Sequence, residues 1–135
     1  MSASCPCQSG KDFAACCQPF LESRALPETA EQLMRSRYSA YATKQLEYLK
    51  DTLWPRYQKS FSAVDTAAYL EQTQWVGLEI LSTEKGLASD AIGSVLFCAK
   101  YIAQGKFGEQ RELSLFKKRK GRWYYVEPLQ EGSRL

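Results

Sequence analysis

Apolar residues in the first half of the chain recur at the spacing of an α-helix. Six positions, apolar except for Arg37, fall on one face of a helix that begins near Pro27, where a proline followed by an acidic residue is typical of a helix start. They are Ala30, Leu33, Met34, Arg37, Tyr38 and Tyr41. We expect two more helices: one over residues 46–53, which stops before Pro55, and one over residues 62–74, with Asp65 as its N-cap.

After Trp75 the pattern changes to that of β-strands. Four segments rich in β-branched and aromatic residues, 75–84, 91–104, 110–119 and 122–127, are separated by glycine-containing turns. Alternation places Val95 and Phe97 on one face of the sheet and Cys98 on the other. Strands joined by short turns form an antiparallel meander. Helices followed by strands predict an α+β domain whose helices pack on one face of a curved antiparallel sheet.

The length and charge of the chain limit the classes of protein to which it can belong. The chain has 135 residues, enough for one domain, and a formal net charge of +3, too small to indicate a nucleic-acid or membrane partner. No apolar run is long enough to cross a bilayer, and no secretory signal is evident, so we expect a cytoplasmic protein. The sequence contains no histidine. That absence excludes a Ser-His-Asp triad and every histidine metal ligand.

Four of the five cysteines, Cys5, Cys7, Cys16 and Cys17, lie in the first seventeen residues. Four thiolates match the ligand set of a structural zinc ion and leave no open position for a catalytic water. We expect Lys11 to offset the charge of the site, and Phe13 and Phe20 to cover its apolar side. Buried thiols, disulfides or a redox pair remain alternatives, although disulfides are rare in a reducing compartment.

A second candidate site combines charged and aromatic residues. Arg37 is the one charge on its apolar helix face, and Glu112 shares a strand face with Phe116, so we expect a buried ion pair between Arg37 and Glu112. Arg35 should point to another side of the helix and be solvated. The pair could floor a ligand cavity or form part of an aromatic core. The candidate lining residues are Arg37, Tyr38, Tyr41, Trp54, Trp75, Glu112, Phe116 and Trp123.

Two sets of residues resemble known families. The segment CPCQSGKDFAACC resembles the SEC-C zinc motif, with Gln8 where that motif usually has glycine. LMRSRYSAY, YLKDTLWP, WVGLEIL and GRWYYVE, which begin at residues 33, 48, 75 and 121, resemble the bacterial YchJ-like family. The resemblance implies a zinc-binding motif over residues 1–20 and a nuclear transport factor 2-like cone over residues 21–135. It implies no established activity.

These observations support two hypotheses for function. In the first, the chain is a zinc-binding accessory protein that docks a protein or a nucleic-acid partner through its four-cysteine motif. No catalytic residue is assigned in this case, and we expect the motif to be separable from the folded body. The alternative is a small-molecule binder or an enzyme of the lyase or isomerase kind, which would use Glu112 and tyrosines in the cone.

Overall fold

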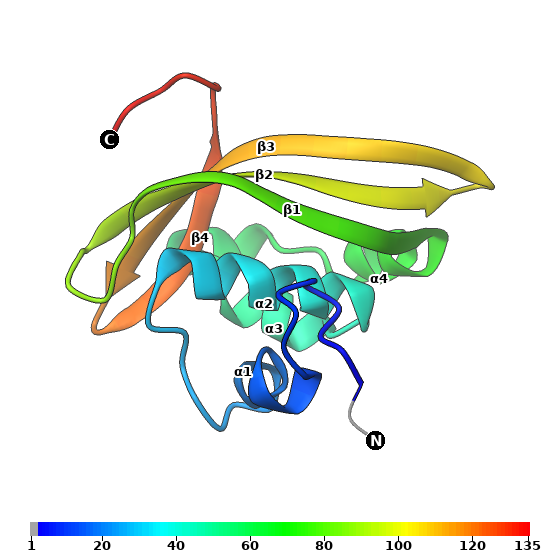
Figure 1. Ribbon diagram of the computed structural model, residues 1–135, viewed down its shortest axis with the longest axis horizontal. Helices are drawn as coiled ribbons and strands as arrows, with labels where there is room; N and C mark the ends of the chain where they lie inside the picture. Colours follow the sequence, from blue (N-terminus) through cyan, green and yellow to red (C-terminus); the bar gives the residue numbers. More distant parts are fainter. Residues whose placement is uncertain (1–2) are drawn as a thin grey trace.

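The computed structural model describes residues 3–135 and places its helices before its sheet (Figure 1). All three predicted helices are present. The helical elements are η1 (Phe13–Ala15), α1 (Gln18–Leu21), α2 (Ala30–Ala42), α3 (Leu46–Asp51), η2 (Pro55–Ser60) and α4 (Ala63–Gln72). The predicted N-cap of α4 is wrong. Ser62 caps this helix by accepting a hydrogen bond from the backbone N–H of Asp65, because Asp65 already lies in the first helical turn.

The four predicted strands form one antiparallel sheet in the order β1-β2-β3-β4. Their bounds are β1 (Thr73–Lys85), β2 (Ile92–Ala103), β3 (Lys106–Arg119) and β4 (Arg122–Leu129). Two-residue turns at Gln104–Gly105 and Lys120–Gly121 have positive φ at both positions, which suits the right-handed twist of a hairpin. The expected alternation on β2 is confirmed, since Val95, Phe97 and Ala99 are buried.

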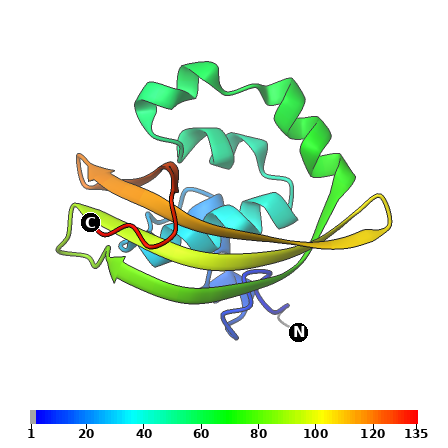
Figure 2. The ribbon, with the colours of Figure 1, turned by 90° about the horizontal axis from the view of Figure 1, so that it is seen from above.

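The sheet is strongly curved, and α2, α3 and α4 lie against its concave side (Figures 1 and 2). The expected α+β architecture is therefore confirmed. Helix α2 is the centre of the packing, because the sheet, α3 and α1 each contact it. Its side chains are consequently buried on more faces than the apolar pattern predicts, and the buried set includes Ser36 and Ser39.

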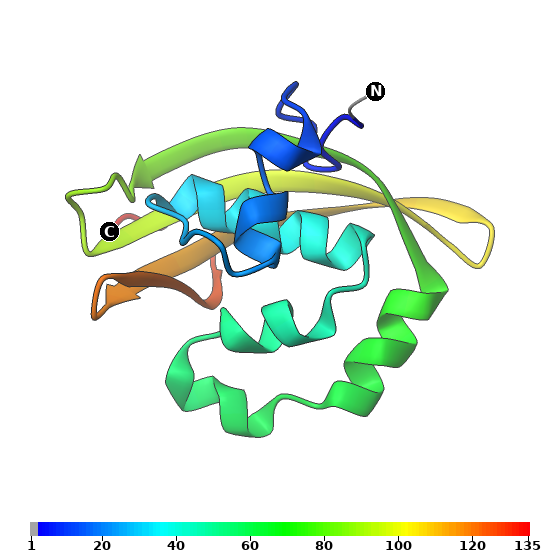
Figure 3. The same ribbon diagram turned by 90° about the horizontal axis from the view of Figure 1, so that it is seen from below.

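The N-terminal segment closes the remaining side of α2 (Figure 3). Viewed from below the helices, residues 3–21 extend from β1 across α2. This segment therefore connects two elements that are far apart from each other in the sequence. Cys98, on the opposite face, is half-buried, because it lies outside the core beside the exposed Glu79 and Arg111 of the neighbouring strands. No helix of the described residues is both long and apolar enough to cross a membrane.

Candidate metal centre

The first cysteine pair lies on a tight loop over residues 4–12. Ser4 and Asp12 form an antiparallel bridge, and the N–H of Cys5 donates to the carbonyl of Lys11 at 2.9 Å. Gly10 has a positive φ of 89°, a conformation that glycine adopts without strain. Gln8, which stands at the usual glycine position of the motif, also has a positive φ of 62°. The glutamine thus preserves the backbone shape of the turn that glycine ordinarily adopts.

The second pair follows at a junction between two short helices. Cys16 ends η1, where its N–H donates to the carbonyl of Phe13, and Cys17 precedes α1. Cys17 lies at the N-cap of α1, and a proline in its first turn fixes the direction in which the chain leaves the site. Two rigid local structures therefore present the two cysteine pairs to each other.

The four sulfur atoms converge within 4.8 Å of one another. The sulfurs of Cys7 and Cys16 are 3.7 Å apart, and those of Cys16 and Cys17 are 3.9 Å apart. A tetrahedral zinc with Zn–S bonds of about 2.3 Å separates its sulfurs by about 3.8 Å. Cys5, Cys7 and Cys17 are buried and Cys16 is half-buried. These four residues, which we call the cysteine cluster, fit one tetrahedral metal ion.

The thiols of the cysteine cluster strongly shift one another's pKa values. Interaction with the Cys17 thiol lowers the pKa of Cys7 to about 4, against the opposing effect of burial. The same interaction, together with burial, raises the pKa of Cys17, while burial is the main cause of the raised pKa of Cys16. The cluster therefore favours negative charge at Cys7 and retains protons that a metal ion would displace.

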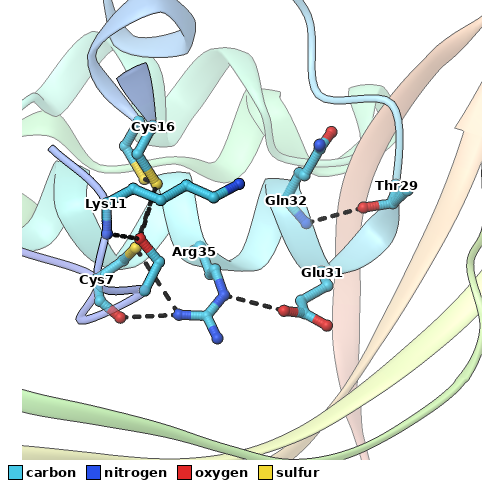
Figure 4. Close-up of polar contacts among 9 residues, drawn as sticks. Cys7, Lys11, Cys16, Thr29, Glu31, Gln32 and Arg35 are labelled. Atoms are coloured by element: carbon cyan, nitrogen blue, oxygen red, sulfur yellow. Dashed lines mark hydrogen bonds and ion pairs between the residues drawn. The ribbon is translucent and has the colours of Figure 1, made fainter. Parts of the chain in front are cut away.

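Arg35 supplies a positive charge beside the cluster, contrary to the expectation that it would be solvated. Its Nη1 donates to the carbonyl of Cys7 at 2.9 Å and lies 3.8 Å from the Cys7 sulfur (Figure 4). Its Nε donates to Glu31 at 3.0 Å, one turn earlier on α2. Lys11, expected in this role, is exposed and makes no ion pair with any described residue. The positive charge beside the cysteine cluster therefore comes from helix α2 and not from the N-terminal cysteine motif.

Two further contacts fix the cluster to the body. The Cys5 sulfur lies 3.6 Å from the hydroxyl of Ser39 on α2. The side-chain amide of Gln8 donates to the carbonyl of Val76 and accepts from the N–H of Leu78, each at 3.3 Å. Val76 lies within an irregularity in the pairing of β1 with β2, between Trp75 and Gly77, where strand groups are free to bond elsewhere. Gln8 thereby joins the loop directly to the sheet.

The cluster is part of the main hydrophobic core. Cys5, Cys7 and Cys17 pack with the apolar residues of α2 and the inner face of the sheet. Phe13 packs against the same core, as expected for a side chain covering the site, whereas Phe20 packs against a second cluster formed around α3 and α4. The cysteine cluster is thus an internal element of the packing and not a protruding knuckle.

The second predicted site lies on the opposite side of α2, facing the sheet. A cavity of about 190 Å³, which we call the aromatic cavity, lies between α2, α4 and strands β1–β4. Six of the eight candidate residues line it: Arg37, Tyr38, Tyr41, Trp75, Glu112 and Phe116. Trp54 and Trp123 do not, because Trp54 packs on Tyr124 and the Trp123 indole donates to the carbonyl of Glu28, just before the start of α2.

Arg37 and Glu112 share this cavity without forming the predicted ion pair. Arg37 donates instead to the carbonyl of Leu49 and to the hydroxyl of Thr52, and its guanidinium lies 4.9 Å from the ring centre of Tyr125. The Tyr125 hydroxyl donates to Glu112 at 2.9 Å, so the tyrosine stands between the two charges. Burial, followed by the Glu112 charge, raises the pKa of Tyr125 and keeps it protonated as a donor.

The cavity includes residues that the sequence pattern did not indicate. Tyr69 of α4 and Tyr125 of β4 line it, as do Gln110 and Ser114 of β3. The two β3 residues occupy alternate positions with Glu112, so strand periodicity could have identified them. Tyr69 and Tyr125 carry no such signal, because their position depends on how α4 and β4 pack across the sheet.

The fold and the cysteine cluster together define a class of protein: a nuclear transport factor 2-like cone with an N-terminal four-cysteine motif. Family models agree with this description. The model described as "YchJ, middle NTF2-like domain" matches residues 29–128, and the SEC-C motif matches residues 1–19. The chain belongs to the YchJ-like family.

Relatives extend over almost the whole chain. A UPF0225 protein of Geobacter sulfurreducens is 39% identical over 94% of this chain and 79% of its own length. A UPF0225 protein of Haemophilus influenzae is 44% identical over 95% of this chain and 79% of its own length. The solution structure of a SEC-C motif containing protein from Rhodopseudomonas palustris superimposes with a TM-score of 0.84 at 32% identity, covering 96% of this chain and 98% of that one.

Proposed function

We propose that the chain binds one structural zinc ion at Cys5, Cys7, Cys16 and Cys17 and uses the folded N-terminal segment to dock a protein partner. The single observation that carries the metal assignment is the convergence of four cysteine sulfurs within 4.8 Å. All four ligands would come from the protein, so the ion would hold the segment in place and would not activate water. Thiolate ligands also favour the reducing cytoplasm as the location of the protein.

The zinc assignment predicts one zinc ion per chain after purification without added metal. Structural zinc sites built from thiolates bind too tightly to lose the ion during purification. Elemental analysis measures the zinc, and thiol titration in denaturant measures free cysteines. Zinc below about a tenth of an equivalent, with the thiols reduced, contradicts the assignment.

The docking surface that we propose is a groove beside Cys16, the most accessible ligand. This docking groove has a volume of about 480 Å³, and its lining includes Lys11, Cys16, Arg35, Lys85 and Leu87. Leu87 is 65% exposed, and neither Lys11 nor Lys85 makes an ion pair with a described residue. An exposed apolar side chain in the same groove as two unpaired lysines suits an acidic protein segment with an apolar anchor.

Charge reversal at the groove tests this docking proposal. We expect the Lys11→Glu/Lys85→Glu variant to lose at least about tenfold in recovery of its partners in a native capture from bacterial cells, because like charges at an interface are strongly unfavourable. Lys59→Glu, an exposed lysine on η2 outside the groove, is the matched control. Equal recovery by both variants contradicts the proposal. So does loss of the captured proteins on nuclease treatment, which assigns the groove to nucleic acid.

A further inference from the structure

The aromatic cavity has room for a small organic molecule and is open to solvent at one end. Its volume of about 190 Å³ is somewhat larger than the engineered cavity of about 150 Å³ that binds benzene in a protein core. Tyr69 of α4 is 43% exposed, Gln110 of β3 is also exposed, and both line this cavity. The same two residues line a second hollow on the outside of the protein. They therefore mark the mouth through which a ligand would enter.

Glu112 faces the cavity from the middle of β3. Its partner on the neighbouring strand is Phe97, which is buried on the concave side of the sheet, and paired residues on adjacent strands share a face. Glu112 Oε2 accepts hydrogen bonds from Ser114 and Tyr125, which also line the cavity. Glu112 Oε1 accepts only from the Gln110 amide, at a long 3.3 Å. Oε1 thus retains a lone pair for a donor on a ligand, and an ammonium group is the donor that a carboxylate binds strongly.

Arg37 faces the same cavity with donors that the protein does not use. Its Nη1 is occupied, because it donates to the carbonyl of Leu49 and to the hydroxyl of Thr52. Its Nε and Nη2 have no hydrogen-bond partner among the described residues. Neither nitrogen is fully buried, since the only fully buried side-chain nitrogen or oxygen without a partner in the described residues belongs to Trp75. Arg37 is only 9% exposed and lines the aromatic cavity, so its remaining donors suit the carboxylate of a ligand bound there.

The charges of Arg37 and Glu112 are near each other without pairing. The guanidinium carbon of Arg37 lies 4.9 Å from the ring centre of Tyr125, whose hydroxyl donates to Glu112 at 2.9 Å. One tyrosine side chain thus spans the distance between the two charges. An α-amino acid carries its ammonium and carboxylate groups on one carbon, and a hydrogen bond of about 2.9 Å at each end gives it a similar span. Because the charges of the site and of the amino acid each cancel, binding would bury no net charge.

We propose that the aromatic cavity binds a free α-amino acid with a small apolar side chain. The ammonium group would bond to Glu112 and the carboxylate to Arg37. The apolar side chain would pack among the rings of Tyr38, Tyr41 and Phe116. This binding function rests neither on the zinc ion nor on the docking groove, which lie on the other side of α2.

L-valine and L-leucine are the probes for this site. In a titration of ¹⁵N-labelled protein, we expect the amide resonances of β3 around Glu112 to shift and saturate with a Kd of about 1 mM or tighter. Isocaproate and isoamylamine share the isobutyl group of leucine but lack its ammonium and its carboxylate, respectively. Each should bind at least about fivefold more weakly than leucine, because one charge of the cavity would lose its partner.

Two results of this titration overturn the proposal. The first is the absence of a saturable shift with either amino acid up to about 20 mM. The second is an affinity for isocaproate or for isoamylamine equal to that for leucine, because the cavity would then recognise a single charge and not an amino acid.

Three variants show whether leucine occupies this cavity. Glu112→Gln should weaken leucine at least about fivefold, whereas Glu79→Gln, an exposed acid paired with Cys98 on the outer face of the sheet, should leave the Kd unchanged. Ala99→Leu adds bulk to the cavity wall and should abolish the shifts. If Ala99→Leu unfolds, which its amide spectrum would reveal, the glutamate pair decides alone. Equal Kd values for the two glutamate variants, or full binding by folded Ala99→Leu, overturn the assignment.

Discussion

Withdrawal of zinc should destabilise the whole domain and not only the N-terminal segment. Three cysteines of the cluster pack in the same core as α2 and the sheet, so loss of the ion would leave buried thiolates or disrupt the core around them. A structural zinc contributes directly to the free energy of folding, with apparent binding free energies of about 10–16 kcal/mol in small zinc domains. This contribution is as large as the whole free energy of unfolding of a typical domain, about 5–15 kcal/mol.

We expect Cys16→Ser/Cys17→Ser, or removal of the ion by a chelator, to lower Tm by at least about 15 °C or to abolish the cooperative transition. Tryptophan fluorescence and circular dichroism measure the transition. Cys98→Ser is the matched control, since Cys98 lies outside the cluster and is half-buried on the sheet. Its unfolding free energy should change by about 1 kcal/mol or less.

Deletion of residues 1–17 gives an independent test of the same expectation. The apolar pattern led us to expect a separable motif, because all four ligands precede the first predicted long helix. The packing of Cys5 against Ser39 and of Gln8 against β1 leads to the opposite expectation. The deletion would uncover one whole side of α2 and should produce a broad, non-cooperative transition. A sharp transition at an unchanged Tm would restore the separable motif and contradict a shared core.

Local signals in the sequence were sufficient for three of the helices, the four strands and the clustering of the cysteines. Helical spacing identified α2, glycine-containing turns separated the strands, and the clustered cysteines defined their own site because the ligands lie within a short loop. The cap of α4 was misplaced by only three residues, from Ser62 to Asp65, since both residue types are good caps.

Residues that meet through tertiary packing were less predictable. Periodicity groups the residues that share a helix face, but it does not indicate which element covers that face. Glu31, Arg35 and Ser39 form one row along α2, four residues apart, and this polar row turns out to face the cysteine cluster. Similarly, Arg37 and Glu112 both line the aromatic cavity, yet the predicted ion pair between them does not form, because Tyr125, from the last strand, lies between them.

Arg35→Met should weaken zinc binding by about 10- to 100-fold, the usual effect of removing an outer partner of a metal ligand. Four thiolates give a zinc site a formal charge of −2, and Arg35 is the cation in direct contact with one of them, at Cys7. Burial alone would lower the pKa of Arg35, but its bonds to Glu31 and Cys7 raise it, so the guanidinium remains charged beside the sulfur. Methionine retains much of the apolar stem and removes the charge and the bond to the Cys7 carbonyl.

Competition with a chromophoric chelator measures the zinc affinity of the Arg35→Met variant. Arg24→Met, which removes an exposed arginine paired only with Glu22, should leave the affinity unchanged. Arg35→Lys should fall between wild type and Arg35→Met, since it restores the charge without the forked donors. With Co²⁺ in place of zinc, the thiolate-to-metal bands should keep their four-sulfur character, because the ligands themselves are unchanged. An affinity within about twofold of wild type, together with a lowered Tm, would assign Arg35 to packing alone and leave the charge of the cluster without a partner.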